Sequence, residues 1–238
     1  SILSSRPSSS QTKKIKHHLY GIISVRKYFS SGDWLKQAKK KINMCLKNKK
    51  LPIVVGGTGL YFNIITKGLT KIPDIDSKTR NKVRTLYKKL GSKKFYEKLS
   101  KLDPKVKGRI FPTDSQRVQR AYEVKLKTKK SLFDWFANTK SDFLDFEIKK
   151  IFINIPREEL LKKISIRTEL MFKKRCINEV KKFNNLRVNK SLSANKLIGV
   201  KEINDFLSRS ISLQKCKDLI NIKTRQYAKR QNTWARGH

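Results

Sequence analysis

The sequence predicts an α/β fold whose sheet is small or incomplete. Two runs rich in β-branched residues, 51–55 and 151–155, have the pattern of strands, and each leads directly into a helical pattern. Residues 19–23 form a possible third strand. Because the strands of an α/β sheet normally alternate with helices over several units, three strands are too few for a self-sufficient sheet. The chain is therefore either mostly α-helical or lacks part of its sheet.

The composition indicates a folded protein that binds a polyanion. The 238 residues include 58 Lys and Arg against 18 Asp and Glu, which gives a formal net charge of +40. An apolar content of 37% suffices for a buried core, and no run approaches the roughly twenty apolar residues of a membrane span. Three cysteines lie far apart without a C-x-x-C pair, which argues against a zinc ribbon or a disulfide framework and fits a reducing cytoplasm.

The chain is expected to form its elements in the following order. A helix begins at Asp33 and ends in the basic run 47–50, and the strand at 51–55 then leads through a glycine turn into a helix from Leu60. Residues 72 to about 140 are rich in lysine and have the pattern of several short helices, broken by prolines and glycines, in a separate module. After the strand at 151–155, Pro156 suits the first position of a helix that extends to Phe172, and the remainder is helical.

The glycine turn Gly56-Gly57-Thr58-Gly59 is a candidate anion site. Glycines let a backbone approach a ligand closely, the next helix presents free N–H groups and the positive end of its dipole, and Thr58 adds a hydroxyl donor. A phosphate or diphosphate would suit these groups, but a tight strand-to-helix turn without a ligand explains them equally well. A complete phosphate loop would need Gly-Lys-Ser/Thr, and no glycine of this sequence is followed by lysine.

Two helices carry candidate RNA contacts. Asp114 is the expected cap of the first, in which Gln116, Arg117 and Arg120 face away from the apolar side. Their amide and guanidinium groups could bond base edges and phosphates, and the alternative is a solvated face on which Arg120 pairs with Glu123.

The final helix has one apolar face and one basic stripe. Tyr227 and Trp234 lie on the apolar face, where core contacts explain them better than base stacking. Arg225 and Lys229 belong to the stripe on the other side, which could follow a phosphate backbone because each neutralised phosphate releases a counterion.

Four blocks of sequence, taken in order, resemble the tRNA dimethylallyltransferases, the tRNA isopentenyltransferase family. The blocks are residues 52–62, 114–120, 198–202 and 224–234, and their order and spacing match along nearly the whole chain. The resemblance implies a parallel-sheet core like that of the phosphate-loop kinases, formed by residues 1–71 and 147–238. It also implies that residues 72–146 are an inserted, all-helical module that grips the tRNA anticodon stem-loop.

The implied reaction transfers a dimethylallyl group from dimethylallyl diphosphate to the N6 amine of adenosine 37, next to the anticodon. A delocalised aromatic amine is a poor nucleophile, so a carboxylate must accept its proton, and the departing diphosphate needs donors and cations. Flipping the base out of its stack brings the amine into a pocket. The alternatives are a noncatalytic basic RNA-binding protein and an adenylate-type isopentenyltransferase. The glycine turn favours an enzyme, and the long basic insert favours tRNA.

The resemblance and the basic stripe together assign the site residues. Thr58 and Arg80 are expected to be catalytic, and Gly56, Gly57, Thr58 and Gly59 are expected to bind the diphosphate. The expected tRNA contacts are Arg80, Gln116, Arg117, Val118, Gln119, Arg120, Lys196, Leu197, Ile198, Gly199, Val200, Lys201, Arg225 and Lys229. Val200 stands where the family usually has Tyr, and Arg175-Cys176 replaces a small, glycine-containing pair.

The resemblance places the family's phosphate loop and its general-base Asp before Ser1. The chain is therefore expected to be truncated and, by itself, to bind RNA better than it catalyses. Its Ser-rich, basic start at 1–16 is explained better by a missing upstream start than by a transit peptide. Mg²⁺ is the implied cofactor, although His17 and His18 lack a third ligand and the residues themselves predict no metal site. A cytoplasmic monomer that binds no membrane is expected.

Overall fold

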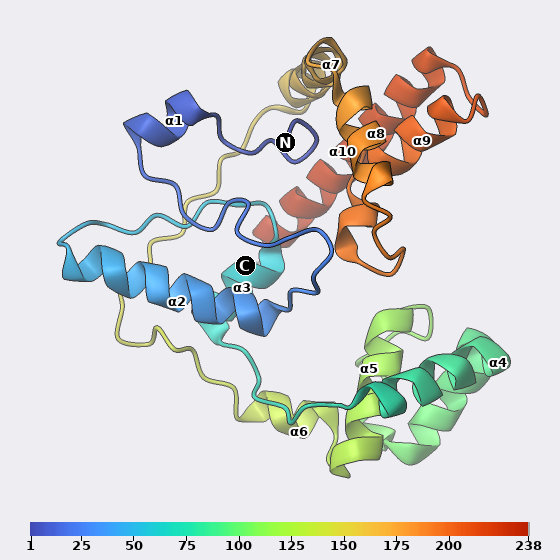
Figure 1. Ribbon diagram of the computed structural model, residues 1–238. Helices are drawn as coiled ribbons and strands as arrows, with labels where there is room; N and C mark the ends of the chain where they lie inside the picture. Colours follow the sequence, from blue (N-terminus) through green and yellow to red (C-terminus); the bar gives the residue numbers. More distant parts are fainter. Residues whose placement is uncertain (238) are drawn as a thin grey trace. The chain divides into compact units, whose positions relative to one another are not determined.

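The computed structural model describes residues 1–237 (Figure 1). The chain divides into two compact units. The first unit comprises Ser1–Phe62 and Lys149–His238, and the second comprises Asn63–Ile148. The second unit is thus a continuous insertion between the two parts of the first, and the module expected at 72–146 falls inside it. Its role in binding tRNA stays a prediction.

The second unit is built around a pair of packed helices, α4 (Ser77–Leu102) and α5 (Ser115–Thr128), which lie side by side in Figure 1. The short η1 (Pro104–Val106) and α6 (Leu132–Ala137) complete it. Helix α4 bends at Gly91, whose φ of 72° lies in the left-handed region. The core between these elements is apolar and contains the buried side chains of Val83, Phe95, Leu99, Val106, Ile110, Val118, Ala121, Tyr122, Val124 and Leu132.

The first unit has its core among its C-terminal helices. These helices are α7 (Arg157–Lys173), α8 (Cys176–Asn185), α9 (Val200–Leu207) and α10 (Leu213–Arg236), with the short η2 (Ser193–Lys196) before α9. Helix α10 packs against α7 and α9. The core is formed by the buried side chains of Leu3, Met171, Cys176, Val180, Val200, Ile203, Cys216 and Ile220. The same unit contains α1 (Ser9–Lys14), α2 (Ser31–Lys47) and the start of α3 (Gly59–Lys67).

The first residues of the chain belong to this core although they are distant from it in sequence. Leu3 is 5% exposed. The Glu179 carboxylate of α8 accepts hydrogen bonds from the Ile2 N–H at 2.6 Å and from the Ser1 hydroxyl at 2.5 Å. The Arg167 guanidinium of α7 donates to the Leu3 carbonyl at 3.2 Å. Two charged side chains therefore fasten the N-terminal segment across α7 and α8.

The expected sheet is absent from the described part of the chain, so the prediction of a parallel-sheet core is wrong for residues 1–237. Residues 51–55 and 151–155 have no regular structure, and most of their side chains are exposed, with Leu51 83% and Ile151 89% accessible. A run of β-branched residues reports only a local preference for extended backbone. A strand also needs a neighbouring chain to pair its N–H and C=O groups, and these two segments do not pair.

The helix signals predicted the structure more accurately than the strand signals. Asp114 caps α5 as predicted, because its side chain accepts a hydrogen bond from the Arg117 N–H at 3.1 Å. Helix α2 begins two residues before the expected start, because Ser30 is its cap and Asp33 closes the capping box from inside the helix. No helix within residues 1–237 is long and apolar enough to cross a bilayer.

The second unit has its entering and leaving segments fastened to one another. The Thr70 and Thr139 hydroxyls are 2.6 Å apart, and the Ser141 hydroxyl donates to the Ile65 carbonyl. Gly68, with a φ of 97°, lies against the backbone of Lys140 so closely that a Cβ would overlap it. The two ends of the insertion are therefore held side by side by polar and steric contacts of their own.

Candidate functional site

The glycine turn precedes α3, and Thr58 is exposed just before the first helical residue. The Thr58 hydroxyl lies 3.5 Å from the Tyr227 hydroxyl of α10, and the Thr58 carbonyl accepts from the Tyr61 N–H at 3.1 Å. An exposed hydroxyl beside the N-terminus of a nine-residue helix can donate to an anion, whose charge the helix dipole favours. The turn therefore presents an exposed hydroxyl beside the N-terminus of α3, with the Tyr227 hydroxyl near it, and its binding of a diphosphate stays a prediction.

Helix α10 lies directly on the turn. A Cβ at Gly57 would overlap the side-chain amide of Gln231, and a Cβ at Gly59 would overlap the indole of Trp234. The Trp234 ring also stacks on Phe62 of α3, with ring centroids 5.9 Å apart. The expected apolar face of the final helix is thus the face that contacts the turn, whereas Arg225 and Lys229 are exposed on the other side.

Helix α2 contacts the first turn of α3 through aromatic side chains. The rings of Trp34 and Tyr61 stack with centroids 4.0 Å apart and an interplanar angle of 9°. Burial raises the pKa of the Tyr61 hydroxyl above its ordinary value, so this group stays protonated and neutral near pH 7. The Trp34–Tyr61 stack therefore gives α3 a rigid lateral support.

Residues 196–201 form the turn into α9, and a buried carboxylate holds that turn. Glu202 is 2% exposed, and it accepts the Gly199 N–H at 2.8 Å and the Lys223 ammonium of α10. Burial acts to raise the pKa of Glu202, but the hydrogen bonds from Lys223 and Gly199 outweigh it and lower that pKa below its ordinary value. Gly199 and Val200 are buried, whereas Lys196 and Lys201 are exposed and Lys201 pairs with Asp205 at 2.5 Å. Leu197 is 37% exposed and Ile198 packs against the core.

The expected RNA contacts on α5 are largely engaged within the helix itself. Arg117 pairs with Asp114 at 2.9 Å, and Arg120 lies 3.6 Å from Glu123, which is the solvated-face alternative for Arg120. The Gln119 amide donates to the Ser115 carbonyl at 3.0 Å. Gln116 is exposed.

Val118 must be corrected as an RNA contact. Its side chain is 0% exposed because it packs in the core between α4 and α5, so it can only anchor the helix.

Helix α4 offers a cationic surface that the sequence reasoning noticed only at Arg80. Among the described residues, none of its basic side chains has a carboxylate partner; they are Lys78, Arg80, Lys82, Arg84, Lys88, Lys89, Lys93, Lys94, Lys98 and Lys101. Arg80 is half-buried, and its Nε has no hydrogen-bond partner. The two residues expected to be catalytic lie in different units, Thr58 in the first and Arg80 in the second. The structure describes the surroundings of each residue within its own unit. The sequence feature that could have predicted this surface is the ratio of charges in α4, which has ten basic residues and a single acidic one, Glu97.

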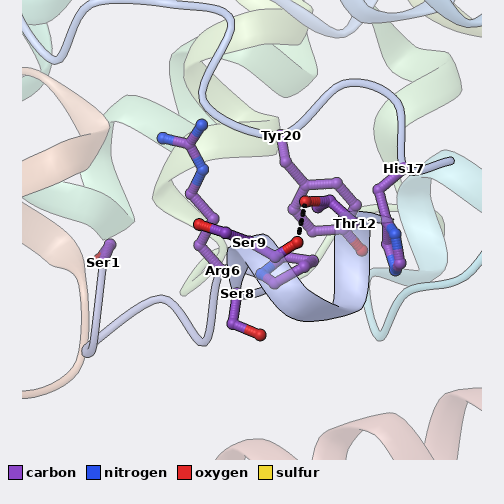
Figure 2. Close-up of a pocket in the computed structure, with 8 residues that line it drawn as sticks. Ser1, Arg6, Ser8, Ser9, Thr12, His17 and Tyr20 are labelled. Carbon is purple, nitrogen blue, oxygen red and sulfur yellow. Dashed lines mark hydrogen bonds between the residues drawn. The ribbon is translucent and has the colours of Figure 1, made fainter. Parts of the chain in front are cut away.

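A separate pocket of about 420 Å³ lies in the N-terminal segment. Figure 2 shows its lining around α1, where the Thr12 hydroxyl donates to the Ser9 carbonyl at 3.0 Å, and Arg6, His17 and Tyr20 are also among the lining residues. None of its lining residues was expected to belong to a site.

The described residues do not form a metal site of their own. Within residues 1–237, no group of three or more His, Cys, Asp and Glu side chains is placed to hold an ion. The side chains that lie against the glycine turn are a hydroxyl, an amide and an aromatic ring, and Mg²⁺ prefers carboxylates and phosphates. The residues present therefore do not fit a magnesium ion held by protein ligands, and no step of the chemistry is assigned to one.

Comparison with known proteins reveals close relatives. A model of the family "IPP transferase" matches residues 1–238. The tRNA dimethylallyltransferase of Pelagibacter ubique is 52% identical over 235 residues, which are 99% of this chain and 75% of that protein. The tRNA dimethylallyltransferase of Rickettsia felis is 38% identical over 98% of this chain and 76% of its own length. These matches give no support to the expectation that a phosphate-loop segment is missing before Ser1.

Solved structures agree with these relatives. The tRNA isopentenylpyrophosphate transferase of Bacillus halodurans is 29% identical, with a TM-score of 0.66 over 100% of this chain and 74% of that chain. A eukaryotic dimethylallyltransferase acting on tRNA is 23% identical, with a TM-score of 0.80 over 98% of this chain and 59% of that chain, and shares the fold. Since the family match spans residues 1–238 and the Pelagibacter relative shares half of the sequence, the chain belongs to the IPP transferase family.

Proposed function

We propose that this protein modifies tRNA by transferring a dimethylallyl group from dimethylallyl diphosphate to the N6 amine of adenosine 37. The family match over residues 1–238 carries the proposal. In the transfer, the amine nitrogen forms a bond to C1 of the dimethylallyl group. The bond from C1 to oxygen breaks, and its electron pair leaves with the diphosphate. The amine proton passes to a base.

The glycine turn is proposed to receive the diphosphate. Negative charge grows on the leaving group as the bond from C1 to oxygen breaks, so donors fixed beside it stabilise the transition state more than the ground state. The exposed Thr58 hydroxyl and the N-terminus of α3 are donors of this kind, and the Tyr227 hydroxyl lies 3.5 Å from Thr58. Because helix α3 is supported by Trp34, these donors need little reorganisation during the reaction.

The second unit is proposed to bind the anticodon stem-loop, with α4 as its principal phosphate-binding surface. Cations without carboxylate partners attract phosphates more strongly than cations that are already paired. On α5, Arg117 and Arg120 have carboxylate partners, whereas the basic side chains of α4 have none among the described residues. The stem carries one phosphate per nucleotide, and binding that neutralises them releases counterions and weakens as salt increases.

The test measures both halves of the function in the full-length protein. Purified protein is incubated with labelled dimethylallyl diphosphate and an anticodon stem-loop, and the modified nucleoside is identified after digestion. Wild-type protein is expected to label adenosine 37, and Thr58→Val is expected to lower kcat about tenfold to a hundredfold, with little loss of tRNA affinity, because it removes one donor to the leaving group. Equal losses of turnover and tRNA affinity would contradict the assigned role of Thr58.

The same experiment separates the remaining alternatives. Stem-loop binding without transfer by the full-length protein would favour a noncatalytic RNA-binding protein. Labelling of free adenylate in place of the stem-loop would favour an adenylate-type enzyme. The expectation that residues 1–238 alone transfer no prenyl group stays a prediction, as do the magnesium requirement, the monomeric state and the cytoplasmic location. Assays with and without added Mg²⁺ test the magnesium requirement.

A further inference from the structure

We infer that Gln231 and Trp234 of α10 are positioning residues for the glycine turn, and that Gly57 and Gly59 are glycines because these two side chains occupy the space beside them. The inference deepens the proposed function, because it makes α10 the element that sets the geometry of the proposed diphosphate site. Neither Gln231 nor Trp234 was expected to act in the reaction.

The contacts follow the helical repeat of α10. Tyr227, Gln231 and Trp234 are spaced at i, i+4 and i+7, so they lie on one face of the helix. This face meets three consecutive residues of the turn: Gln231 lies against Gly57, Tyr227 lies near Thr58, and Trp234 lies against Gly59. One face of the C-terminal part of α10 is therefore matched to the turn.

The reason for glycine in this turn is space and not backbone conformation. Gly57 and Gly59 do not adopt a left-handed φ, so their backbones would accept other residues. Gly91 and Gly108 are the opposite case, because each has a φ of 72° and an added Cβ would meet nothing within 4 Å. At Gly57, an added Cβ would overlap the Gln231 amide and lie 2.8 Å from its Cδ.

The consequence for the reaction is positional. The turn and α10 touch at Gly57 and Gly59, on both sides of Thr58, so a shift of the turn away from α10 moves the Thr58 hydroxyl and the first N–H groups of α3. Misplacement of catalytic donors by about 1 Å costs on the order of a hundredfold in rate. Helix α10 is itself fixed on α9 by the Lys223–Glu202 pair. Gln231 and Trp234 thus act through the turn and are not required to touch the substrate.

A four-protein cycle tests this inference in the full-length protein: wild type, Gly57→Ala, Gln231→Ala and Gly57→Ala/Gln231→Ala. The measurements are Tm, kcat/KM for dimethylallyl diphosphate and Kd for the stem-loop. Gly57→Ala is expected to lower Tm and to lower kcat/KM about tenfold, because the new methyl group must displace the flexible end of the Gln231 side chain from its place beside the turn. Removing the Gln231 amide makes room for that methyl group, so the double variant is expected to recover Tm and to have the kcat/KM of Gln231→Ala alone.

Control variants distinguish positioning from general damage. Gln231→Ala alone is expected to change kcat/KM for dimethylallyl diphosphate several-fold while Kd for the stem-loop stays within about twofold. Gln214→Ala, near the other end of α10, removes the same type of side chain, whose amide bonds Asp218 at 3.0 Å, and is expected to leave kcat/KM unchanged.

Two outcomes would overturn the inference. One is that Gly57→Ala lowers kcat/KM by the same factor, and Tm by the same amount, whether or not Gln231 is also replaced by Ala. That result would mean that Gly57 is needed for close approach of the ligand, because shortening residue 231 would not relieve such a defect. The other is a harmless Gly57→Ala. If wild-type protein transfers no dimethylallyl group, the proposed function fails, whereas the Tm values of the same cycle still decide the packing relation between Gly57 and Gln231.

Discussion

Glu202 is a buried charge that joins two segments of the first unit. It links the Gly199 turn to Lys223 of α10, and Gly199, with a φ of 104°, would have its Cβ 2.6 Å from a methyl carbon of Leu3. Removing one partner of a buried pair leaves an uncompensated group in the core and typically costs about 3–5 kcal/mol. Because the Lys223 side chain is itself 43% exposed, the cost at this site is smaller than that.

Glu202→Gln is therefore expected to lower Tm, and the size of the effect is expected to depend on pH. The pKa of Glu202 is depressed in the folded state, so its stabilising contribution is present above the ordinary value of 4.5 and is lost as pH falls through the folded pKa. The Tm difference between wild type and Glu202→Gln should be largest above about pH 5 and should shrink at lower pH. A difference that is constant down to about pH 3 would contradict the ion pair.

Residues that act locally could be predicted from sequence, and residues that act across the chain could not. The Asp114 cap and the Arg120–Glu123 alternative depend on neighbours within one turn, and both were identified in advance. The contact of Gln231 with Gly57 joins segments far apart in the chain, and a glutamine at i+4 from Tyr227 carries no mark of its partner. The one sequence feature that pointed to a contact of Gln231 was its position on the apolar face of the final helix.

At the scale of elements, α4 consists of two helical segments that meet at Gly91, and it combines buried apolar positions with many exposed lysines. Its apolar positions, among them Phe95 and Leu99, are buried against α5, while its lysines remain without carboxylate partners in the described chain. Lysines close together on one helix repel each other and reduce its stability. Retaining them suits a surface whose partner supplies the negative charge.

Replacing Lys82 and Lys89 of α4 by Gln is expected to weaken stem-loop binding and to flatten its salt dependence. Each phosphate that is no longer neutralised should reduce the slope of log K against log salt by about 0.7 to 0.9. Lys181→Gln/Lys182→Gln on α8, in the other unit, removes the same charge and is the matched control. Equal effects of the two pairs on the slope would show that net charge alone, and not α4, determines binding.

The strands are the elements that sequence could not predict. Residues 51–55 and 151–155 have the right composition, but pairing is a relation between segments and not a property of either one. The helices were identified because their hydrogen bonds close within the segment, so caps and apolar periodicity carry most of the signal. The expected α/β class failed where long-range pairing was required.

At the scale of the whole molecule, the described residues form two hydrophobic cores, one in each unit. One contains Phe95, whose ring lies 5.1 Å from Tyr87 and 5.0 Å from Tyr122, and the other contains Cys176 and Cys216. Burial raises the pKa of the Cys176 and Cys216 thiols to about 11, so both are protonated and unreactive near neutral pH. These thiols therefore report on the opening of the first unit alone.

Phe95→Ala is expected to destabilise the second unit by about 3–5 kcal/mol and to leave the labelling rate of Cys176 and Cys216 unchanged under native conditions. Ile203→Ala, in the core that holds the thiols, should accelerate their labelling. Loss of ellipticity on heating and thiol labelling with a disulfide reagent at about pH 8 provide the two measurements. Faster labelling of both thiols in Phe95→Ala would show that the cores unfold together.

The contacts of Thr70 with Thr139 and of Ser141 with Ile65 close the inserted segment into a loop. They therefore determine where in the chain the entropic cost of closing this long loop is met. Closing a loop costs more as the loop lengthens, although only logarithmically. Here the closing contacts lie within the second unit, so the first unit does not have to hold the two ends of the insertion together. Insertions or deletions between these contacts could therefore accumulate during evolution without changing the stability of the first unit.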